Sequence, residues 1–125
     1  MAINPVGVCP VLHVSNLTES LKYYTEVFGA VQDFMWEGFY AGVTLGERKL
    51  HLSMGCGAFG RPIGGANIYF ILESPAAVDE AYAQIIAAGG KTDKEPQNYP
   101  YGMRDFVAFD LDQNMLTFGA DCEVA

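Results

Sequence analysis

One order of predicted elements occurs twice in this chain of 125 residues, and it limits the possible folds more than any other feature. The first half is predicted to contain a strand, a helix and three strands, at residues 7–14, 17–28, 31–37, 39–45 and 49–54. The second half repeats that order at residues 67–73, 75–88, 91–95, 103–111 and 115–120. The chain therefore reads as two copies of a βαβββ unit.

Local signals support both helices. Asn16 followed three residues later by Glu19 is typical of a capping box at a helix N-terminus. Apolar side chains then recur on one helical face, at Leu17, Leu21, Tyr24 and Phe28. The second helix is predicted to begin at Ser74-Pro75, with proline at its first position, and to end at Gly89. Each helix has one apolar face, which must pack against a sheet.

The unit boundaries follow from glycine and proline. Residues 55–66 contain five glycines and show no periodicity, so they are predicted to connect a first repeat at about 1–57 to a second at about 64–125. Pro10 cannot donate a hydrogen bond, which places the first strand at a sheet edge. One unit cannot cover its own apolar face. We therefore expect a single α+β domain in which two sheets curl around a shared cleft, with the helices outside.

Composition excludes several functional classes. Seven Lys and Arg against fifteen Asp and Glu give a net charge of −8, which repels nucleic acid and anionic membranes. The sequence contains neither a secretion signal nor an apolar run of the roughly 20 residues that span a bilayer, so a cytoplasmic location is expected. Cys9, Cys56 and Cys122 are irregularly spaced, which indicates reduced thiols. The expected partner is a small molecule.

Two segments carry a resemblance to a known family. VLHVSNLTESLKYYTEVFGA at residues 11–30 and YGMRDFVAFDLDQNMLTFG at 101–119, together with the doubled βαβββ order, resemble the vicinal oxygen chelate superfamily. That superfamily contains glyoxalase I, extradiol dioxygenases, fosfomycin-resistance enzymes and bleomycin-resistance proteins. The resemblance covers nearly the whole chain and implies the fold. Because this fold hosts lyases, dioxygenases, isomerases, transferases and binding proteins, it does not imply one reaction.

The resemblance also implies four positions where the family's metalloenzymes place metal ligands. In this chain they are Cys9, His51, Asn67 and Thr117, where family enzymes usually have His, Glu or Gln, with a glutamate on the last strand. Divalent metals at such sites need about three or four His and carboxylate ligands. Thr117 cannot replace a carboxylate base, and Asn67 is a weak ligand for transition metals. A glyoxalase I activity is therefore not expected.

Cys9 and His51 allow three interpretations. Both side chains suit zinc, and strand alternation places them on the face opposite Val8, Leu50 and Leu52. The favoured interpretation is a small buried thiol beside a hydrogen-bonded pocket histidine, because two ligands do not complete a metal site. A Cys-His nucleophile pair is the third interpretation, and no cationic neighbour or third orienting residue supports it.

The main hypothesis is a metal-independent binding protein similar to the bleomycin-resistance branch, with no cofactor. It would sequester an aromatic or cationic compound such as an antibiotic, and the resemblance together with Pro10 implies a homodimer. Aromatic side chains would stack on the ligand and polar ones would orient it. The predicted binding residues are Cys9, Trp36, Phe39, Tyr40, His51, Asn67, Tyr69, Tyr101, Arg104 and Thr117.

Two alternatives remain open from the sequence. The first is a metal-dependent lyase, isomerase or dioxygenase in which Cys9 and His51 bind one divalent metal ion with unforeseen ligands; an enzyme of this kind would be a glyoxalase-like lyase. The second is a dimeric interaction or regulatory module without a ligand. Metal content separates the first alternative from the main hypothesis, and ligand binding separates the second.

Overall fold

The structure is a computed structural model that describes residues 2–54 and 62–123. The first half contains β1 (Val11–His13), α1 (Leu17–Glu26), β2 (Val31–Trp36), β3 (Tyr40–Leu45) and β4 (Arg48–Ser53). The second half contains β5 (Asn67–Ile71), α2 (Pro75–Ala87), β6 (Lys91–Thr92), β7 (Gln97–Asn98), β8 (Met103–Phe109) and β9 (Met115–Asp121). The predicted tandem order and the α+β class are confirmed. Most of the predicted connector, including Cys56, lies outside the described residues.

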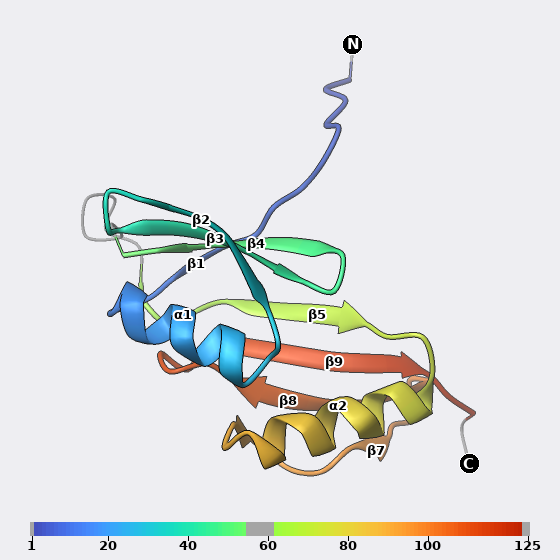
Figure 1. The fold of residues 1–125 in the computed structure, drawn as a ribbon. Helices are drawn as coiled ribbons and strands as arrows, with labels where there is room; N and C mark the ends of the chain where they lie inside the picture. Colours follow the sequence, from blue (N-terminus) through green and yellow to red (C-terminus); the bar gives the residue numbers. More distant parts are fainter. Residues whose placement is uncertain (1, 55–61, 124–125) are drawn as a thin grey trace.

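Each half folds into its own mixed sheet (Figure 1). The first sheet has the strand order β1-β4-β3-β2, and the second has the order β5-β9-β8-β6 with β7 also paired to β8. The first strand of each half pairs in parallel with the last strand of that half, β1 with β4 and β5 with β9. The remaining pairs are antiparallel. The two sheets are therefore topological copies of each other.

Strand boundaries differ most from the prediction in the first strand and in residues 91–102. The strand predicted at 7–14 covers only Val11–His13, because Pro10 has no N–H to donate; its carbonyl still accepts a 2.9 Å bond from the His51 N–H. The segment before β1 extends away from both sheets (Figure 1). The strand predicted at 91–95 is the two-residue β6, and the predicted loop at 96–102 contains β7.

Helix capping follows the sequence signals. The Asn16 Oδ1 atom accepts a 3.0 Å hydrogen bond from the Glu19 N–H, and the Ser74 Oγ atom accepts one of 3.1 Å from the Ala77 N–H. Both glycines predicted to follow the helices have positive φ, +72° at Gly29 and +84° at Gly89. Neither helix in the described part of the chain is long and apolar enough to cross a membrane.

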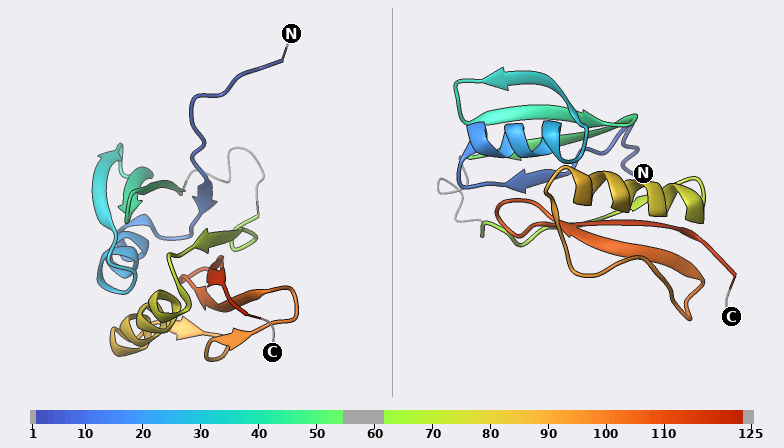
Figure 2. Two further views of the ribbon diagram at one scale, coloured as in Figure 1. Left: turned by 90° about the vertical axis from the view of Figure 1, so that its right-hand side faces the viewer. Right: turned by 60° about the horizontal axis from the view of Figure 1, so that its bottom comes forward.

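One hydrophobic core joins the two halves. Figure 2 shows α1 against the first sheet and α2 against the second. The ring of Phe28, just after α1, lies 6.3 Å from the ring of Phe118 on β9, and the Tyr24 hydroxyl donates a 2.8 Å bond to Asp110 Oδ2 beyond β8. The helix-covered faces therefore share a core, and each sheet has a second face that no helix covers. We call these the first and second open faces.

Candidate functional site

Strand alternation assigns the predicted site residues to the open faces. On β3 and β4, Ala41, Val43, Leu50 and Leu52 are fully or almost fully buried on the helix side. The residues between them face the other way. The first open face is defined by Phe34, Trp36, Tyr40, Gly42, Thr44, Lys49 and His51. The second open face is defined by Asn67, Tyr69, Asp105, Thr117 and Gly119, with Tyr101 from the loop before β8.

The first open face carries an aromatic cluster. The Tyr40 hydroxyl and His51 Nδ1 are hydrogen-bonded at 2.8 Å, and the Phe34 ring contacts both residues, at centroid distances of 6.3 Å and 5.3 Å. Gly42 makes this arrangement possible, because a Cβ atom there would collide with the Phe34 ring. Trp36 is 60% exposed and lies 5.6 Å from Phe39, ring centroid to ring centroid. The face therefore offers flat apolar surface next to a polar His–Tyr pair.

Cys9 lies near this cluster as a free thiol. Burial raises its pKa, and the nearby Lys49 charge opposes that shift only in part. The pKa of Tyr40 is also raised, first by desolvation and then by Cys9. At neutral pH Cys9 is therefore a thiol rather than a thiolate, which makes it a poor nucleophile and requires deprotonation before it can bind a metal ion.

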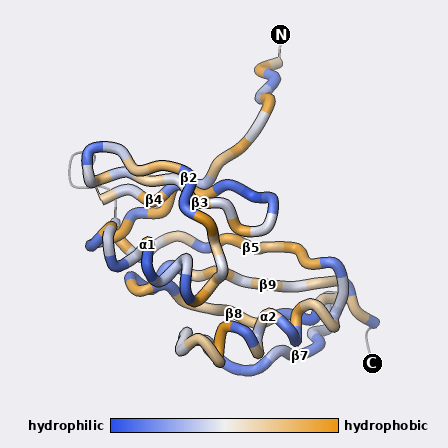
Figure 3. Tube along the Cα trace, in the orientation of Figure 1, coloured by the Kyte–Doolittle hydropathy of each residue, from blue (hydrophilic) through white to orange (hydrophobic). Residues whose placement is uncertain are grey.

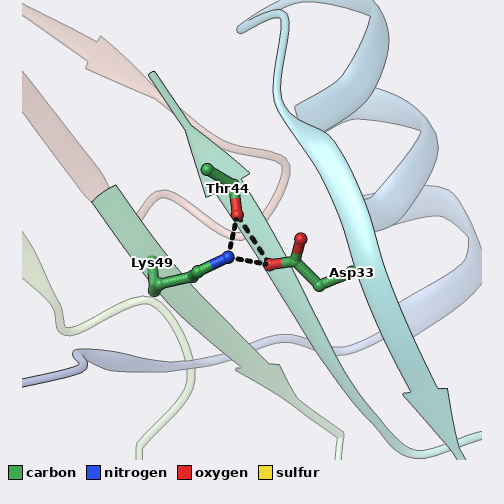
Figure 4. Close-up of polar contacts among 3 residues, drawn as sticks. All are labelled: Asp33, Thr44 and Lys49. Atoms are coloured by element: carbon green, nitrogen blue, oxygen red, sulfur yellow. Dashed lines mark hydrogen bonds and ion pairs between the residues drawn. The ribbon is translucent and has the colours of Figure 1, made fainter. Parts of the chain in front are cut away.

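A polar group that the sequence analysis missed occupies the same face (Figure 4). Asp33 Oδ2 accepts a 2.7 Å hydrogen bond from the Thr44 hydroxyl and a 3.3 Å bond from Lys49 Nζ, which also donates to Thr44 at 2.7 Å. The Thr44 hydrogen bond, followed by the contact with Lys49, lowers the pKa of the Asp33 carboxyl. The pairing of Thr44 with Lys49 could be predicted from the hairpin register. Asp33 could not, because it lies at a β-bulge that no sequence pattern indicates.

The second open face centres on a buried carboxylate. The hydroxyls of Tyr69 and Tyr101 each donate a 2.8 Å hydrogen bond to the same atom, Asp105 Oδ2. Asp105 is only 6% exposed. Gly119 leaves room for Tyr69, because a Cβ atom there would collide with the tyrosine hydroxyl. Desolvation together with Asp105 raises the pKa of Tyr101 to about 12 and that of Tyr69 even further.

Three other predicted residues have different surroundings. Thr117 and Asn67 are neighbours on the second open face, with a long 3.5 Å contact from the Thr117 hydroxyl to Asn67 Oδ1. Arg104 does not join them. Its side chain lies 2.8 Å from Asp79 of α2 and donates a 3.0 Å bond to Asn98 of β7, so it ties the sheet to the helix.

The four positions implied for metal ligands come from the two different halves of the chain and form a poor donor set. Cys9 and His51 belong to the first half, and the neutral side chains of Asn67 and Thr117 belong to the second. The described ranges contain no group of three or more His, Cys, Asp or Glu side chains that could hold a metal ion. These residues do not fit a divalent transition metal, because an amide and a hydroxyl stand where strong ligands are needed.

A cavity lies between the two halves, and Lys49 and Tyr69 of the two open faces contribute to its lining. Its volume is about 750 Å³, and it is bounded by the β3–β4 turn, β5, α2 and the end of α1. Its lining is largely apolar and includes Val8, Leu50, Phe70 and Ile85. Of the ten predicted binding residues, only Tyr69 lines it.

Asp105 is the most informative residue that the sequence analysis missed. It directly precedes the apolar run Phe106–Phe109 on β8, and a charged residue within a largely apolar strand is a signal of a buried polar group. Tyr101 is four residues away in the sequence, whereas Tyr69 on β5 is 36 residues away. Only the fold brings Tyr69 to the other two residues.

Comparisons with known proteins agree with this architecture. The family described as the Glyoxalase/Bleomycin resistance protein/Dioxygenase superfamily matches residues 3–118. No curated protein sequence gives a significant match. A glyoxalase/bleomycin resistance protein/dioxygenase from Nocardioides is 20% identical with a TM-score of 0.80, covering 100% of this chain and 89% of that one. A lactoylglutathione lyase from Agrobacterium tumefaciens is 19% identical with a TM-score of 0.77, covering 93% and 94%. At these identities the structures are evidence for the fold alone.

Proposed function

This chain belongs to the glyoxalase/bleomycin resistance protein/dioxygenase superfamily, and we propose that it binds an aromatic or cationic small molecule, such as an antibiotic, on its open faces without a metal ion. Binding would sequester the molecule without changing it. The observation that carries the proposal is the exposed aromatic cluster of the first open face, where Trp36, Phe34 and Phe39 are all accessible. Clustered exposed aromatic side chains on a protein surface mark binding sites.

The donor chemistry supports a metal-independent mechanism. Two of the four positions where related enzymes hold a metal ion carry an amide and a hydroxyl, and the Cys9 thiol is protonated at neutral pH. The His51 imidazole is hydrogen-bonded to Tyr40 and packed against Phe34. These contacts suit a histidine whose ring nitrogen atoms orient a bound aromatic ligand.

A homodimer is part of this proposal. Each open face is one side of a single sheet, so a ligand bound there would keep much of its own surface in water. Small-molecule sites usually bury most of the ligand. All six residues of β2, from Val31 to Trp36, are exposed. A second copy of the chain would cover this edge and turn the open faces into walls of a groove.

Fluorescence titration with thioflavin T, a planar aromatic cation, and melting curves with bleomycin test the proposal. We expect saturable thioflavin T binding that weakens by about 10-fold in Trp36→Leu, since stacking on a desolvated aromatic face contributes about 1 kcal/mol or more. Ile86→Ala is the matched control, because it removes an exposed apolar side chain from α2. Equal binding by Trp36→Leu and wild type would contradict the proposed site.

Metal analysis provides the independent check. Protein purified without chelator is expected to contain no stoichiometric transition metal, and added EDTA should leave thioflavin T binding unchanged. Stoichiometric zinc, nickel, manganese or iron that is lost in His51→Ala would overturn the metal-independent mechanism and favour a metal-dependent lyase, isomerase or dioxygenase.

A further inference from the structure

We propose that Asp105 on the second open face binds the positively charged group of the ligand, an amidinium or ammonium attached to an aromatic ring. This inference rests on the proposed function, because it names the chemical group by which the bound molecule is recognised. The site consists of Asp105, Tyr69 and Tyr101. Gly119 packs against Tyr69, because it has no side chain that would collide with the tyrosine.

The first argument is that Asp105 is a buried carboxylate without a cationic partner. It is 94% buried, and its two hydrogen-bond donors are neutral phenols. Within residues 2–54 and 62–123, the two ion pairs are Lys49 with Asp33 and Arg104 with Asp79. Arg104 is the neighbour of Asp105 in sequence but lies on the helix-covered side of the sheet. An uncompensated buried carboxylate is unfavourable, and a bound cation would relieve that cost.

A second buried carboxylate shows what a purely structural role looks like here. Asp110 receives hydrogen bonds on both oxygen atoms, from Tyr24, from the side chain and backbone of Asn114, and from the backbone of Asp112. Asp105 receives both of its bonds on Oδ2, and no described residue donates to Oδ1. In the described ranges the fully buried side-chain polar atoms without a partner are His13 Nδ1 and Ser20 Oγ, so Asp105 Oδ1 is not completely sealed off from solvent. Asp105 therefore keeps an acceptor free where Asp110 does not.

The third argument is that two aromatic side chains lie next to the Asp105 carboxylate. Tyr69 is 43% exposed and Tyr101 is 64% exposed, so their rings are accessible beside the carboxylate. Tyr101 stacks on Tyr99 at 5.3 Å with an interplanar angle of 2°, and Lys94 Nζ already lies 5.6 Å from the centre of the Tyr99 ring. Aromatic faces attract cations in this geometry. The protein's own ammonium group thus shows that the aromatic stack next to Asp105 accepts a positive charge.

The electrostatic potential around Asp105 also favours a cation. Asp121 lies close enough to raise the pKa of Tyr69 through its charge, in addition to Asp105. The second half of the chain carries ten of the fifteen acidic residues and four of the seven basic ones. This charge raises the local concentration of cations, and the Asp105 carboxylate provides the directional contact with N–H donors.

Three probes of nearly equal shape and different charge test the inference. Benzamidine is a cation, benzamide is neutral and benzoate is an anion. Isothermal titration calorimetry on the full chain should detect benzamidine binding. Benzamide should bind at least about 10-fold more weakly and benzoate should not bind, because the contact is a charge-assisted hydrogen bond. Equal affinity for benzamidine and benzamide would overturn the inference.

Two matched variants separate direct contact from a general charge effect. Asp105→Asn keeps the shape and the ability to accept from Tyr69 and Tyr101, and it should reduce benzamidine affinity by about 10-fold or more. Asp121→Asn removes the same charge from an exposed residue of β9 on the same face of the sheet and should change the affinity by less than about 3-fold. An equal loss in both variants, or unchanged binding in Asp105→Asn with a wild-type melting temperature, would refute a direct Asp105 contact.

The same experiments distinguish this inference from the proposed function. If wild type and Asp105→Asn bind thioflavin T equally and benzamidine does not bind, the aromatic site stands and the cation site is refuted. If neither thioflavin T nor any of the three probes binds, the proposed function fails and the inference fails with it.

Discussion

The paired tyrosines give Asp105 a signature that can be measured without any ligand. Desolvation first and the hydrogen bond to Asp105 second raise the pKa of Tyr101 to about 12, and they raise that of Tyr69 further. In an ultraviolet titration at the phenolate absorption band, Tyr24 and Tyr40, whose pKa values burial also raises, should ionise late, and so should Tyr69 and Tyr101. In Asp105→Asn, Tyr69 and Tyr101 should shift towards the ordinary tyrosine pKa of about 10. An unchanged titration curve in that variant would contradict the two hydrogen bonds.

The same shift predicts how stability depends on alkaline pH. Tyr101 keeps its proton in the folded protein up to about pH 12, whereas it loses it near pH 10 when unfolded. Since the folded state then binds more protons, the free energy of unfolding falls as pH rises through this interval, and the contribution is fully present below pH 10. Urea titrations between pH 9 and 11.5 should show this decline, with a shallower slope in Tyr101→Phe. A steeper slope in Tyr101→Phe would contradict the assignment.

At the level of single residues, the sequence predicted the two faces better than their chemistry. Alternation predicted that His51 lies on the face opposite Leu50 and Leu52, and the structure buries both leucines on the helix side while His51 lies on the first open face. Tyr40, Tyr69 and Thr117, which were predicted as binding residues, also lie on faces that no helix covers. Arg104 was also predicted as a binding residue. It follows a loop whose shape the sequence did not predict, and its side chain pairs with Asp79 on α2 rather than joining the other predicted residues. Asp105 was missed because one of its two partners, Tyr69, becomes its neighbour only through the pairing of β5 with β9 and of β9 with β8.

At the level of elements, the β8–β9 turn connects the two halves. Its buried Asp110 accepts the Tyr24 hydroxyl of α1 at 2.8 Å, and Asn114 donates a 3.2 Å bond to the carbonyl of His13. Tyr24→Phe leaves the carboxylate with one donor fewer and should lower the free energy of unfolding by about 1–3 kcal/mol. Tyr82→Phe is the matched control, since the Tyr82 ring packs on Phe106 and its hydroxyl has no described partner. Equal urea midpoints for both variants would contradict this role of the turn.

Element boundaries show where sequence patterns lose information. Both helices were predicted within about two residues, because capping side chains and glycines are local signals that act through the backbone. The strand predicted at 91–95 ends early at Thr92, because the Asp93 side chain accepts the Val107 N–H and interrupts regular pairing. β7 then resumes the pairing with β8 at Gln97. Such a break depends on the opposite strand, which no local pattern encodes.

At the level of the whole molecule, exposed apolar side chains indicate a second contact surface for the proposed dimer. Ile3, Val6 and Val8 are almost fully exposed on the segment that extends from β1, and Figure 3 shows hydrophobic positions along that segment. Val8 also lines the cavity of about 750 Å³ between the halves. A monomer rarely leaves so much apolar surface in water, and in the proposed dimer reciprocal exchange of this segment, in addition to contact at the β2 edge, would cover it.

Sedimentation velocity tests this arrangement. Wild type is expected to sediment as a dimer, and the triple variant Ile3→Ser, Val6→Ser and Val8→Ser should shift the population towards monomer by weakening dimerisation at least about 10-fold, since each buried Val or Ile side chain contributes about 1.5–3 kcal/mol. Asn4→Ala is the control, because it changes a polar residue of the same segment. If wild type is a monomer at every concentration, the dimer is refuted. If the triple variant is instead as dimeric as wild type, the chains associate through another surface, such as the exposed edge strand β2.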